Sequence, residues 1–501
     1  MGFIDRMLSG VGLQRMGMSG EGSLRGARRG RLSNTFEQER KHINAAILSG
    51  GATLRARSRY HCREGGLLEA AKSTWVAYAV GSGIAPTWPD VTPEVRRVLH
   101  KAFHKWAKRC DHDGLTTYYG LQAIIAGEMF EAGEVFIRFI RSPGRPVQLQ
   151  LIRSEQLPYD VIYAVGGDTD VRLGIEFAKN TNRRIAYHFY RQDPGDSTKA
   201  TSADIIERVP AEEILHVYRV EQPGQLRGIP QTKSALIPSI KLDSYDDNML
   251  DRAEVASAFA VFIKRDQNDR ESGAANGQNP ETGEPEAHIE GGSIIEGGPG
   301  EEPFVIDPPD AGTNYDAFTF RQATRCTAAM GVPYAETTGD LRKANYSSTR
   351  AGRQPFKRRI EQHQQFWMVP QFCDPVVLAW LADALLRDSI ALPESEPRVL
   401  DAYDNIDHVP PYWEYVDPRG DAQADVLLVD NLIKARSRVA AERGEDPVEL
   451  DETIAVDQAR EKRLKLVRGS TSTARKEPEE DEDEDRDDPD DKPDDEEKDD
   501  Q

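Results

Sequence analysis

The first apolar pattern in the chain is helical. Between residues 64 and 131 apolar side chains recur every three or four positions, as at Val95, Leu99, Phe103 and Trp106. Thr92 followed by Glu94 is typical of a helix start. Helices are therefore expected at 64–80, 92–109 and 114–131.

From residue 133 the pattern changes to short segments rich in β-branched and aromatic residues, separated by turn residues such as Asn180 and Asn182. They read GEVFIRFIRS, PVQLQLIRS, VRLGIEFAK, RRIAYHFYRQ and EILHVYRV. Residues 60–220 are therefore expected to form an α+β domain. His188 and His216 fall within these segments and are expected to be hydrogen-bonded residues of a sheet.

A dense bend ends this domain. In EQPGQLRGIP (221–230), Pro223, Gly224, Gly228 and Pro230 break regular structure, and Pro230 suits the first position of a helix. The helical pattern that follows runs to Ile263 and would be about 50 Å long at ~1.5 Å per residue. Pro238 is expected to break or kink it.

This long helix carries two different faces. A narrow apolar stripe follows helical spacing and suits packing against a helix of another subunit. The opposite face is acidic, which suits water or a polyanion that must slide, because proteins that grip DNA use Lys and Arg. The stripe consists of Leu242, Tyr245, Met249, Ala253, Ala256 and Ala260, and the acids are Asp243, Asp246, Asp247, Asp251 and Glu254.

The second half alternates between polar segments and helices. Residues 266–312 are rich in Gly and Pro and predict a linker or a long functional loop. A helix is expected at 314–330, then a loop broken by Gly331, Pro333 and Gly339. Ser347 or Ser348 then caps a helix that Pro355 should kink. A further helix is expected after Pro375 and two amphipathic helices within 420–466. The helix from 347 is basic through Arg350, Arg353, Lys357, Arg358 and Arg359.

The charge is unevenly distributed. The 501 residues suggest roughly two to four domains. The net charge is −21, and the acidic end, 477–501, holds 18 acids and 3 bases, so that the remainder carries only −6. Such a tail is expected to be disordered. The first 60 residues hold 11 bases and 4 acids, which is typical of either a nucleic-acid arm or a flexible terminus.

The sequence offers no clear active site. It has no GxxxxGK[ST] phosphate loop, no HExxH and no CxxC pair. Its four widely spaced cysteines predict reduced thiols in a cytosolic environment, and no apolar run reaches membrane-spanning length. The cluster Cys110, Asp111, His112, Asp113 is interpreted as a loop rather than a metal site, because neighbours on a turn rarely converge on one ion. No catalytic residue, metal or cofactor is expected.

Several stretches in order resemble the lambda-like family of tailed-phage portal proteins. They are WAKRCDHDGLTTYYGLQ (106–122), GEVFIRF (133–139), HVYRVEQPGQLRGIPQ (216–231), NYSSTRAGR (345–353), WEYVDPRGDAQAD (413–425) and AAERGED (440–446). PGQLRGIP and NYSSTRAG are the most specific. The resemblance covers about residues 30–467.

The resemblance implies a portal fold of the α+β class, with an α/β wing, a helical stem, a small clip, a helical crown and a disordered acidic tail. The parts would be a flexible basic arm (1–59), the wing (60–229), stem helix 1 (230–265), the clip (266–312), stem helix 2 (313–331), a tunnel loop (332–346), a long kinked wing helix (347–399), the crown (400–467) and the tail (468–501).

It also implies function and partners. Portals form rings, usually of twelve subunits, at one capsid vertex, and double-stranded DNA enters and later leaves through the channel. The implied partners are the terminase large subunit that pumps the DNA, the major capsid protein and scaffold, and a head–tail adaptor. No membrane partner is implied. The protein would be made in the host cytoplasm and reside in the virion.

Candidate residues follow by position. Thr337, Thr338, Asp340, Arg342 and Lys343 of the tunnel loop are candidates for DNA contact, although Arg342 and Lys343 could instead bridge to acids of a neighbouring subunit. Asp243, Asp247, Asp251 and Glu254 would face the channel. The elbow residues Gln225, Arg227, Gly228 and Pro230 would either fix the bend or contact a neighbour. The basic stripe at 350–359 would face DNA phosphates or pair with the acidic stem helix.

Two other classes of protein remain as alternatives. One is another phage ring or shell component, which would have no DNA-wide channel. The other is a nucleic-acid enzyme whose site is built from scattered carboxylates, which would cleave nucleic acid in a metal-dependent way.

Overall fold

The computed structural model describes most of the chain between residues 42 and 466. The described ranges are 42–162, 168–196, 205–258, 261–263, 277–278, 285–286, 294–296, 315–342, 346–390, 405–413, 417–443 and 447–466. Lys343, Ala260 and the acidic tail lie outside them, as do most of 266–312 and of the basic arm. The chain divides into two compact units, 1–446 and 447–501, and the second contributes helix α14 (Pro447–Leu464).

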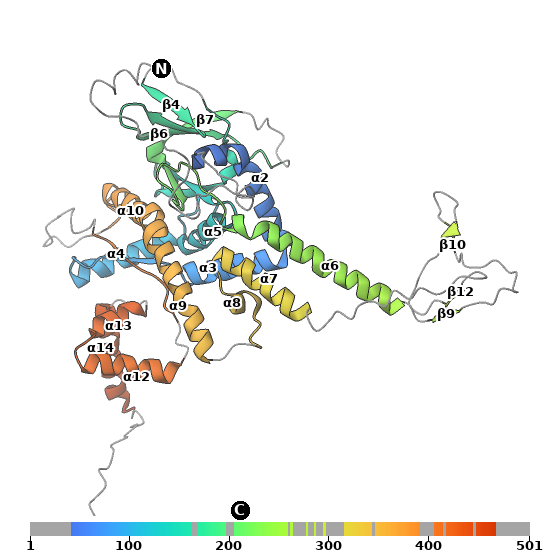
Figure 1. Ribbon diagram of the computed structural model, residues 1–501. Helices are drawn as coiled ribbons and strands as arrows, with labels where there is room; N and C mark the ends of the chain where they lie inside the picture. Colours follow the sequence, from blue (N-terminus) through green and yellow to red (C-terminus); the bar gives the residue numbers. More distant parts are fainter. Residues whose placement is uncertain are drawn as a thin grey trace, which may run out of the picture. The chain divides into compact units, whose positions relative to one another are not determined.

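Four helices open the described chain (Figure 1): α2 (Ile43–Glu64), α3 (Gly66–Val80), α4 (Pro93–Ala107) and α5 (Tyr118–Glu131). The face of α4 that carries Val95, Leu99, Phe103 and Trp106 is buried, as the spacing predicts. The prediction of a flexible arm at 1–59 was wrong for the last part of that range, because residues from Ile43 onward form α2. This helix escaped the pattern because two of the side chains it buries, Arg55 and Ser58, are polar.

The two largest described sheets of the first unit are both antiparallel. One has the order β3-β2-β8, from β2 (Glu134–Ile140), β3 (Gln148–Ile152) and β8 (Ile214–Tyr218). The other has the order β4-β5-β6-β7, from β4 (Thr169–Arg172), β5 (Ile175–Ala178), β6 (Arg184–Tyr190) and β7 (Ile206–Pro210). Short 3-10 turns follow β3 and precede β8, at Ser154–Gln156 and Ala211–Glu213.

The segment VRLGIEFAK forms a hairpin, not the single strand expected. Leu173 and Gly174 adopt φ values of 52° and 79°, and Arg172 pairs with Ile175 across the turn. Two consecutive left-handed residues make the kind of tight turn whose twist suits a hairpin. Glycine favours that conformation but leucine does not, so the sequence carried only half of the turn signal.

A pair of helices, α6 and α7, follows this domain in the sequence. After the 3-10 turn η5 (Gln231–Ser234), helix α6 runs from Leu236 to Ala258 beside α7 (Tyr315–Met330) (Figure 1). Pro230 therefore precedes a 3-10 turn and does not start the α-helix, and Pro238 lies in the first turn of α6, where its missing N–H breaks no bond. In the sequence, the two helices are separated by a segment that contains the short strands β9 (Val261–Ile263), β10 (Gly277–Gln278), β11 (Pro285–Glu286) and β12 (Ile294–Glu296).

The chain then returns through a continuous helical stretch. Helix α8 (Tyr334–Thr338) precedes α9 (Tyr346–His363), a π-helical segment, η6 (Gln364–Cys373), and α10 (Asp374–Leu386). Ser347 and Ser348 lie in the first turn of α9 and not before it. Both Pro355 and Pro370 lie inside the stretch. Later come β13 (Asp407–Val409), paired with β1 (Ala85–Thr87), and α12 (Pro418–Asp430) and α13 (Arg436–Glu442).

The stretch 350–386 is the one described helix long and apolar enough to cross a membrane. It is, however, a core helix: Phe356 and Ile360 are buried with α3, α5 and α7, while Met368, Phe372 and Trp380 are buried against α4 and α5. A third core lies on the sheets and includes Phe136, Phe177 and Phe189 together with Leu226 of the bend.

Candidate functional site at the elbow and the helix pair

The bend 221–230, called the elbow below, is held by its own side chains. Gln225 is 4% exposed, and its Oε1 accepts the N–H of Glu221 (2.8 Å) while its Nε2 donates to the Arg227 carbonyl (2.8 Å). Asn44, in the first turn of α2, donates to the Gly224 carbonyl (2.9 Å) and accepts the Leu226 N–H (3.0 Å). Gln225 therefore fixes the shape of the turn within one chain.

Arg227 is fully buried and anchors the elbow to the first sheet. Its guanidinium donates to both carboxylate oxygens of Glu134, at 2.6 and 3.0 Å, and to the carbonyls of Leu173 (2.8 Å) and Leu157 (2.9 Å). The Leu173 carbonyl belongs to the left-handed hairpin turn. A planar fork of donors suits such a bidentate site, which lysine could not fill.

Gly228 lies against the backbone that starts β2. A Cβ added to Gly228 would lie 2.1 Å from the Gly133 carbonyl oxygen, and one added to Gly133 would lie 2.3 Å from the Ile229 carbonyl carbon. The Gly228 N–H also donates to Glu134 (2.7 Å). Position 228 therefore requires glycine, because the two backbones approach too closely for a side chain. Pro230, two residues further on, has φ −52° and precedes the 3-10 turn that starts at Gln231.

Glu134 stays ionised in this buried site. Burial raises its pKa, but the Arg227 charge and hydrogen bonds from His216 and Arg227 outweigh it and hold the pKa well below the ordinary value. His216 Nε2 lies 3.0 Å from Glu134, and burial, opposed by Glu134, lowers the pKa of His216 to about 4. His216 is therefore a neutral sheet residue at pH 7, bonded as expected.

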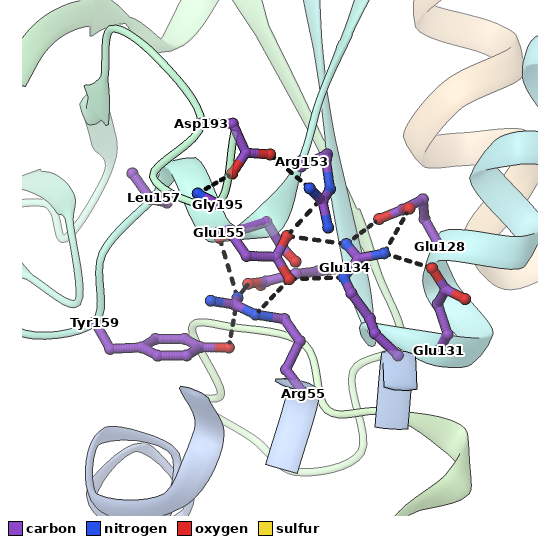
Figure 2. Close-up of polar contacts among 12 residues, drawn as sticks. Arg55, Glu128, Glu131, Glu134, Arg153, Glu155, Leu157, Tyr159, Asp193 and Gly195 are labelled. Carbon is purple, nitrogen blue, oxygen red and sulfur yellow. Dashed lines mark hydrogen bonds and ion pairs between the residues drawn. The ribbon is translucent and has the colours of Figure 1, made fainter. Parts of the chain in front are cut away.

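The network continues onto α2 and α5. Figure 2 shows Arg55 between Glu155 and Tyr159, at 3.3 and 3.1 Å, and Arg55 also lies 3.7 Å from Glu134. Arg59 contacts three carboxylates, those of Glu128, Glu131 and Glu155. The partners of Arg227 were not found from the sequence; the available signal was Glu134, an acidic residue at the first position of a mostly apolar strand.

Tyr245, in the apolar stripe of α6, faces α7 of the same chain. Its ring stacks on Tyr315 (6.0 Å between centroids) and meets Phe318 edge-on (5.2 Å). Asp246 accepts a hydrogen bond from the Tyr315 hydroxyl (2.9 Å). Leu242 is buried and Met249 half-buried, whereas Ala253 is exposed. At Tyr245, therefore, the partner is the second helix of the chain itself; the side chain of Ala256 lies outside the described part.

On the acidic face, Asp247, Asp251 and Glu254 are exposed. Asp243 is half-buried beside the end of α2, and burial together with Asp246 and Asp247 raises its pKa, which His61 partly offsets. The spacing of four, four and three residues keeps the acids on one side of the helix. This side turns away from the Tyr245 contacts.

The segment 332–346, called the tunnel segment below, contains helix α8 where the sequence predicted only loop. Thr337 is 8% exposed and donates to the Pro333 carbonyl, so it is the least available of the four candidates that the structure describes. Thr338 is exposed and donates to the Tyr334 carbonyl. Arg342 is paired with Asp340 (2.8 Å) and with Asp316 of α7 (3.1 Å). The acidic partners described for Arg342 are therefore Asp340 of the same segment and Asp316 of α7.

The basic stripe of α9 has partners other than the two expected. Arg350 pairs with Asp421 (3.2 Å), and Arg353 with Glu336 (2.6 Å). Lys357 lies 5.9 Å from the ring centre of Trp413, and Arg358 pairs with Glu361 (3.4 Å). The acidic partners described for these residues belong to α8, α9 and α12.

The loop at 110–113 behaves as a turn. Asp111 accepts the N–H groups of Leu115 (2.8 Å) and Thr116 (3.0 Å), and no cluster of metal-ligating side chains occurs within the described residues.

Comparison with known proteins gives consistent matches. The model of the family described as phage portal protein, lambda family, matches residues 29–364. A probable portal protein of Halomonas phage phiHAP-1 is 26% identical over 383 residues, which are 74% of this chain and 72% of that protein. Portal protein B of Escherichia phage lambda is 22% identical over 257 residues, 47% of this chain and 48% of that protein.

Among solved structures, a chain from the neck of an empty gene-transfer-agent (GTA) particle computed with C6 symmetry covers 77% of this chain and 93% of its own length, with 15% identity and a TM-score of 0.39. The family model matches well over half of the residues. The chain therefore belongs to the lambda family of phage portal proteins.

Proposed function

We infer that this chain is the portal subunit of a tailed phage, a ring component at one capsid vertex through which double-stranded DNA is packaged and ejected. The observation that carries this inference is the family match across residues 29–364, which includes the elbow and both helices of the pair. The ring is a homo-oligomer, with twelve copies as the expected number. The chain is the conduit, and a separate terminase supplies the chemical energy.

The helix pair is the proposed stem, with the acidic face of α6 turned to the channel. Asp247, Asp251 and Glu254 are exposed there, and repeated around a ring they would present a negative wall. Such a wall makes no phosphate contacts of the kind that tighten DNA binding by counterion release. DNA would therefore slide instead of binding.

The tunnel segment is the proposed point of DNA contact. Arg342 is largely exposed, and its ion pairs with Asp340 and Asp316 are of the weak, salt-sensitive surface type. A DNA phosphate would compete for the same guanidinium. Lys343, which lies outside the described residues, is proposed to act beside it. The terminase, the capsid protein with its scaffold, and a head–tail adaptor are the proposed protein partners.

Negative-stain microscopy of the purified protein tests the function. Rings with a central hole wide enough for duplex DNA are expected. Only monomers or closed shells, under every assembly condition, would contradict a portal. Metal-dependent cleavage of DNA by the same sample would instead favour an enzyme.

The tunnel segment is tested separately with Arg342→Ala plus Lys343→Ala. We expect rings to form and DNA packaging to fall, measured as DNA protected from nuclease per particle. Loss of rings would mean that these residues hold subunits together.

A further inference from the structure

The exposed face of α4 is basic, although the chain as a whole carries a net charge of −21. Between residues 101 and 109 every exposed side chain is Lys, Arg or His. These side chains belong to Lys101, His104, Lys105, Lys108 and Arg109. Glu94, the exposed acid of α4, lies in the first turn, at the other end of the helix. Positive charge therefore gathers on the last two turns of α4 and directly after them.

The turn between β2 and β3 adds two bases beside the end of α4. Arg141 and Arg145 are exposed in this turn. Trp106 Nε1 donates to the Val147 carbonyl (2.8 Å), and Leu149 makes two backbone hydrogen bonds with the loop that follows α4 (2.7 and 2.9 Å). Bases from two distant stretches of sequence therefore lie close together. They are called the basic patch below: Lys101, Lys105, Lys108, Arg109, Arg141 and Arg145.

The six bases of the patch make no ion pair within the described part of the chain, and Arg141 lies over the Phe139 ring (5.4 Å). Bases near the end of a helix complement its partial negative charge. That role fits Lys105 and the two bases that follow the helix. It does not fit Lys101, which lies more than one turn before the end of α4, or the two arginines of the turn. The helix end therefore accounts for only half of the patch.

The acids of the adjoining elements do not neutralise the patch. Asp111 is buried and accepts backbone N–H groups of its own loop, and Asp383 of α10 pairs with Arg387 (2.9 Å). Asp113 and Asp388 are exposed in neighbouring loops. The six bases therefore outnumber the acids around them, and the surface attracts anions.

The patch lacks the side chains that anchor a protein or a single strand. No large apolar side chain is exposed in 92–109 or in 141–146. Protein interfaces depend on a few anchors buried in well-packed pockets, and single-stranded nucleic acids stack their bases on aromatic rings. Duplex DNA needs neither, because Lys and Arg bind its backbone through charge and the release of counterions. A surface of cations alone therefore fits a duplex best.

We propose that the basic patch binds the phosphate backbone of duplex DNA without sequence preference. A duplex presents one negative charge about every 1.7 Å along its axis, and Lys101 and Lys105 are about 6 Å apart along α4, so both bases find phosphates in many registers. The patch belongs neither to α6 nor to the tunnel segment. It is therefore a further DNA contact, in addition to passage through the proposed channel, and the binding itself does not rest on the portal function.

The salt dependence of binding tests the proposal. Fluorescence anisotropy of the full chain with a short fluorescein-labelled duplex gives the binding constant at several salt concentrations. Neutralising Lys101→Gln, Lys105→Gln and Arg109→Gln together should weaken binding at low salt about tenfold or more. The slope of log K against log salt should fall by about 3, because each phosphate contact contributes about 0.9. An unchanged slope would overturn the proposal.

Two matched variants separate the patch from net charge and from folding. Arg57→Gln, Arg63→Gln and Arg438→Gln remove the same charge from exposed positions of α2 and α13 and should bind DNA like the parent. An equal loss in this control would mean that only net charge matters, against the proposal. Exchanging the bases instead, as Lys101→Arg, Lys105→Arg and Arg109→Lys, keeps the charge and should keep the affinity. Loss of binding in this variant would also contradict a contact made by charge alone.

Competition tests the other occupants. A single-stranded oligonucleotide of equal length should bind more weakly than the duplex, and tighter binding would overturn the choice of a duplex. A synthetic peptide of residues 477–501, with its 18 acids, should not displace the duplex at a lower concentration than unlabelled duplex does. If it does, the patch is a site for acidic protein segments and the proposal fails.

The tunnel segment is separated by Arg342→Ala plus Lys343→Ala. This variant should keep the salt-dependent binding that the patch variant loses. Complete loss of DNA binding in the tunnel variant would place the contact there and refute the patch. Microscopy of the same samples separates the two inferences: rings without DNA binding at the patch contradict only this site, and binding at the patch without rings contradicts only the portal.

Discussion

At the scale of single residues, the elbow depends on one buried ion pair. Arg227 and Glu134 are both fully buried, and the Arg227 guanidinium donates to the Glu134 carboxylate and to the carbonyls of Leu173 and Leu157. The desolvation of two buried charges is offset only when both are present and well bonded. The pair therefore specifies where the elbow docks, and the loss of one member costs more than the pair contributes.

Arg227→Met tests this asymmetry. It should lower the free energy of unfolding by about 3–5 kcal/mol, because it leaves the Glu134 carboxylate buried without its cation. Adding Glu134→Gln should recover part of the loss, measured as denaturation midpoints. Arg358→Met, whose side chain is 84% exposed, is the control and should stay within about 0.5 kcal/mol. Equal effects of the two arginine changes would contradict this account.

Glycine substitutions give a second test. Gly228→Ala places a Cβ into the Gly133 backbone and should cost more than about 3 kcal/mol or prevent soluble expression. Gly50→Ala, in the middle of α2 with no atom within 4 Å of the new Cβ, should instead stabilise the protein by about 0.5–1 kcal/mol. Thermal midpoints would show both, and a tolerated Gly228→Ala would disprove the close approach.

The buried histidines predict acid sensitivity. Burial lowers the pKa of His216 to about 4, against about 6.5 in the unfolded chain. The unfolded state therefore binds the proton first, so the contribution of His216 to stability is fully present above about pH 6.5 and is lost as the pH drops toward 4, by roughly 3 kcal/mol. His363, whose pKa burial lowers to about 3, acts in the same direction.

His216→Gln should make the loss of unfolding free energy between pH 7 and 4.5 smaller than in the parent, measured by denaturation across pH. His112→Gln, at an exposed position, is the matched control and should follow the parent. A parent whose stability does not change over this range would contradict the neutral, buried state of His216.

At the scale of elements, the spacing of apolar residues and the positions of Gly and Pro predicted most helices and strands, and the exceptions share a cause. Helix α2 was missed because its buried face includes Arg55 and Ser58, and the 173–174 turn because Leu173 adopts a conformation typical of glycine. The tunnel segment was expected to be loop, yet Gly339 in fact ends helix α8 with φ 69°. The π-helical segment η6 could not be predicted from the spacing of apolar residues. In each case tertiary contacts override local preference.

For the candidate site, too, one part could be predicted from the sequence and another could not. The importance of the elbow could be predicted from Pro and Gly density, but the partners of Arg227 come from β2 and the 173–174 turn, far away in sequence. Nothing in the spacing of the α6 stripe identifies α7 as the partner of Tyr245, and packing of the stripe against another subunit stays a prediction. Pairing between distant segments is what a single sequence cannot show.

The helix pair predicts a local effect. Asp246→Ala removes the acceptor of the Tyr315 hydroxyl and should cost about 0.5–1.5 kcal/mol of local stability, seen as faster hydrogen exchange in α6 and α7. Asp247→Ala, one residue on but exposed, should leave exchange unchanged. Identical exchange in both variants would mean that the hydroxyl contact does not hold the helices together.

At the scale of the whole molecule, the portal function turns a weak charge pattern into a strong one. One copy of α6 carries only a few exposed acids, whereas the proposed ring would repeat them around its channel. Over distances below the Debye length of about 8–10 Å such repeated charges act together on DNA.

Charge reversal tests whether the acidic face of α6 faces the channel, as proposed. Asp247→Lys plus Asp251→Lys should leave rings intact but slow DNA packaging, and added salt should restore part of the rate because phosphate contacts weaken with salt. The same double change to Asn should have a much smaller effect. Normal packaging by the Lys variant would place this face away from the DNA.

The tight backbone contact between Gly133 and Gly228 has a mechanical consequence. Helix α6, with 23 residues, is a lever about 35 Å long that begins a few residues beyond this contact. A tilt of about 5° at its base would move its far end by about 3 Å, close to the rise of two residues. In the proposed ring, where α6 would line the channel, the width of the bore at the far end of the helix would therefore depend on how far the backbones at Gly133 and Gly228 can move against each other.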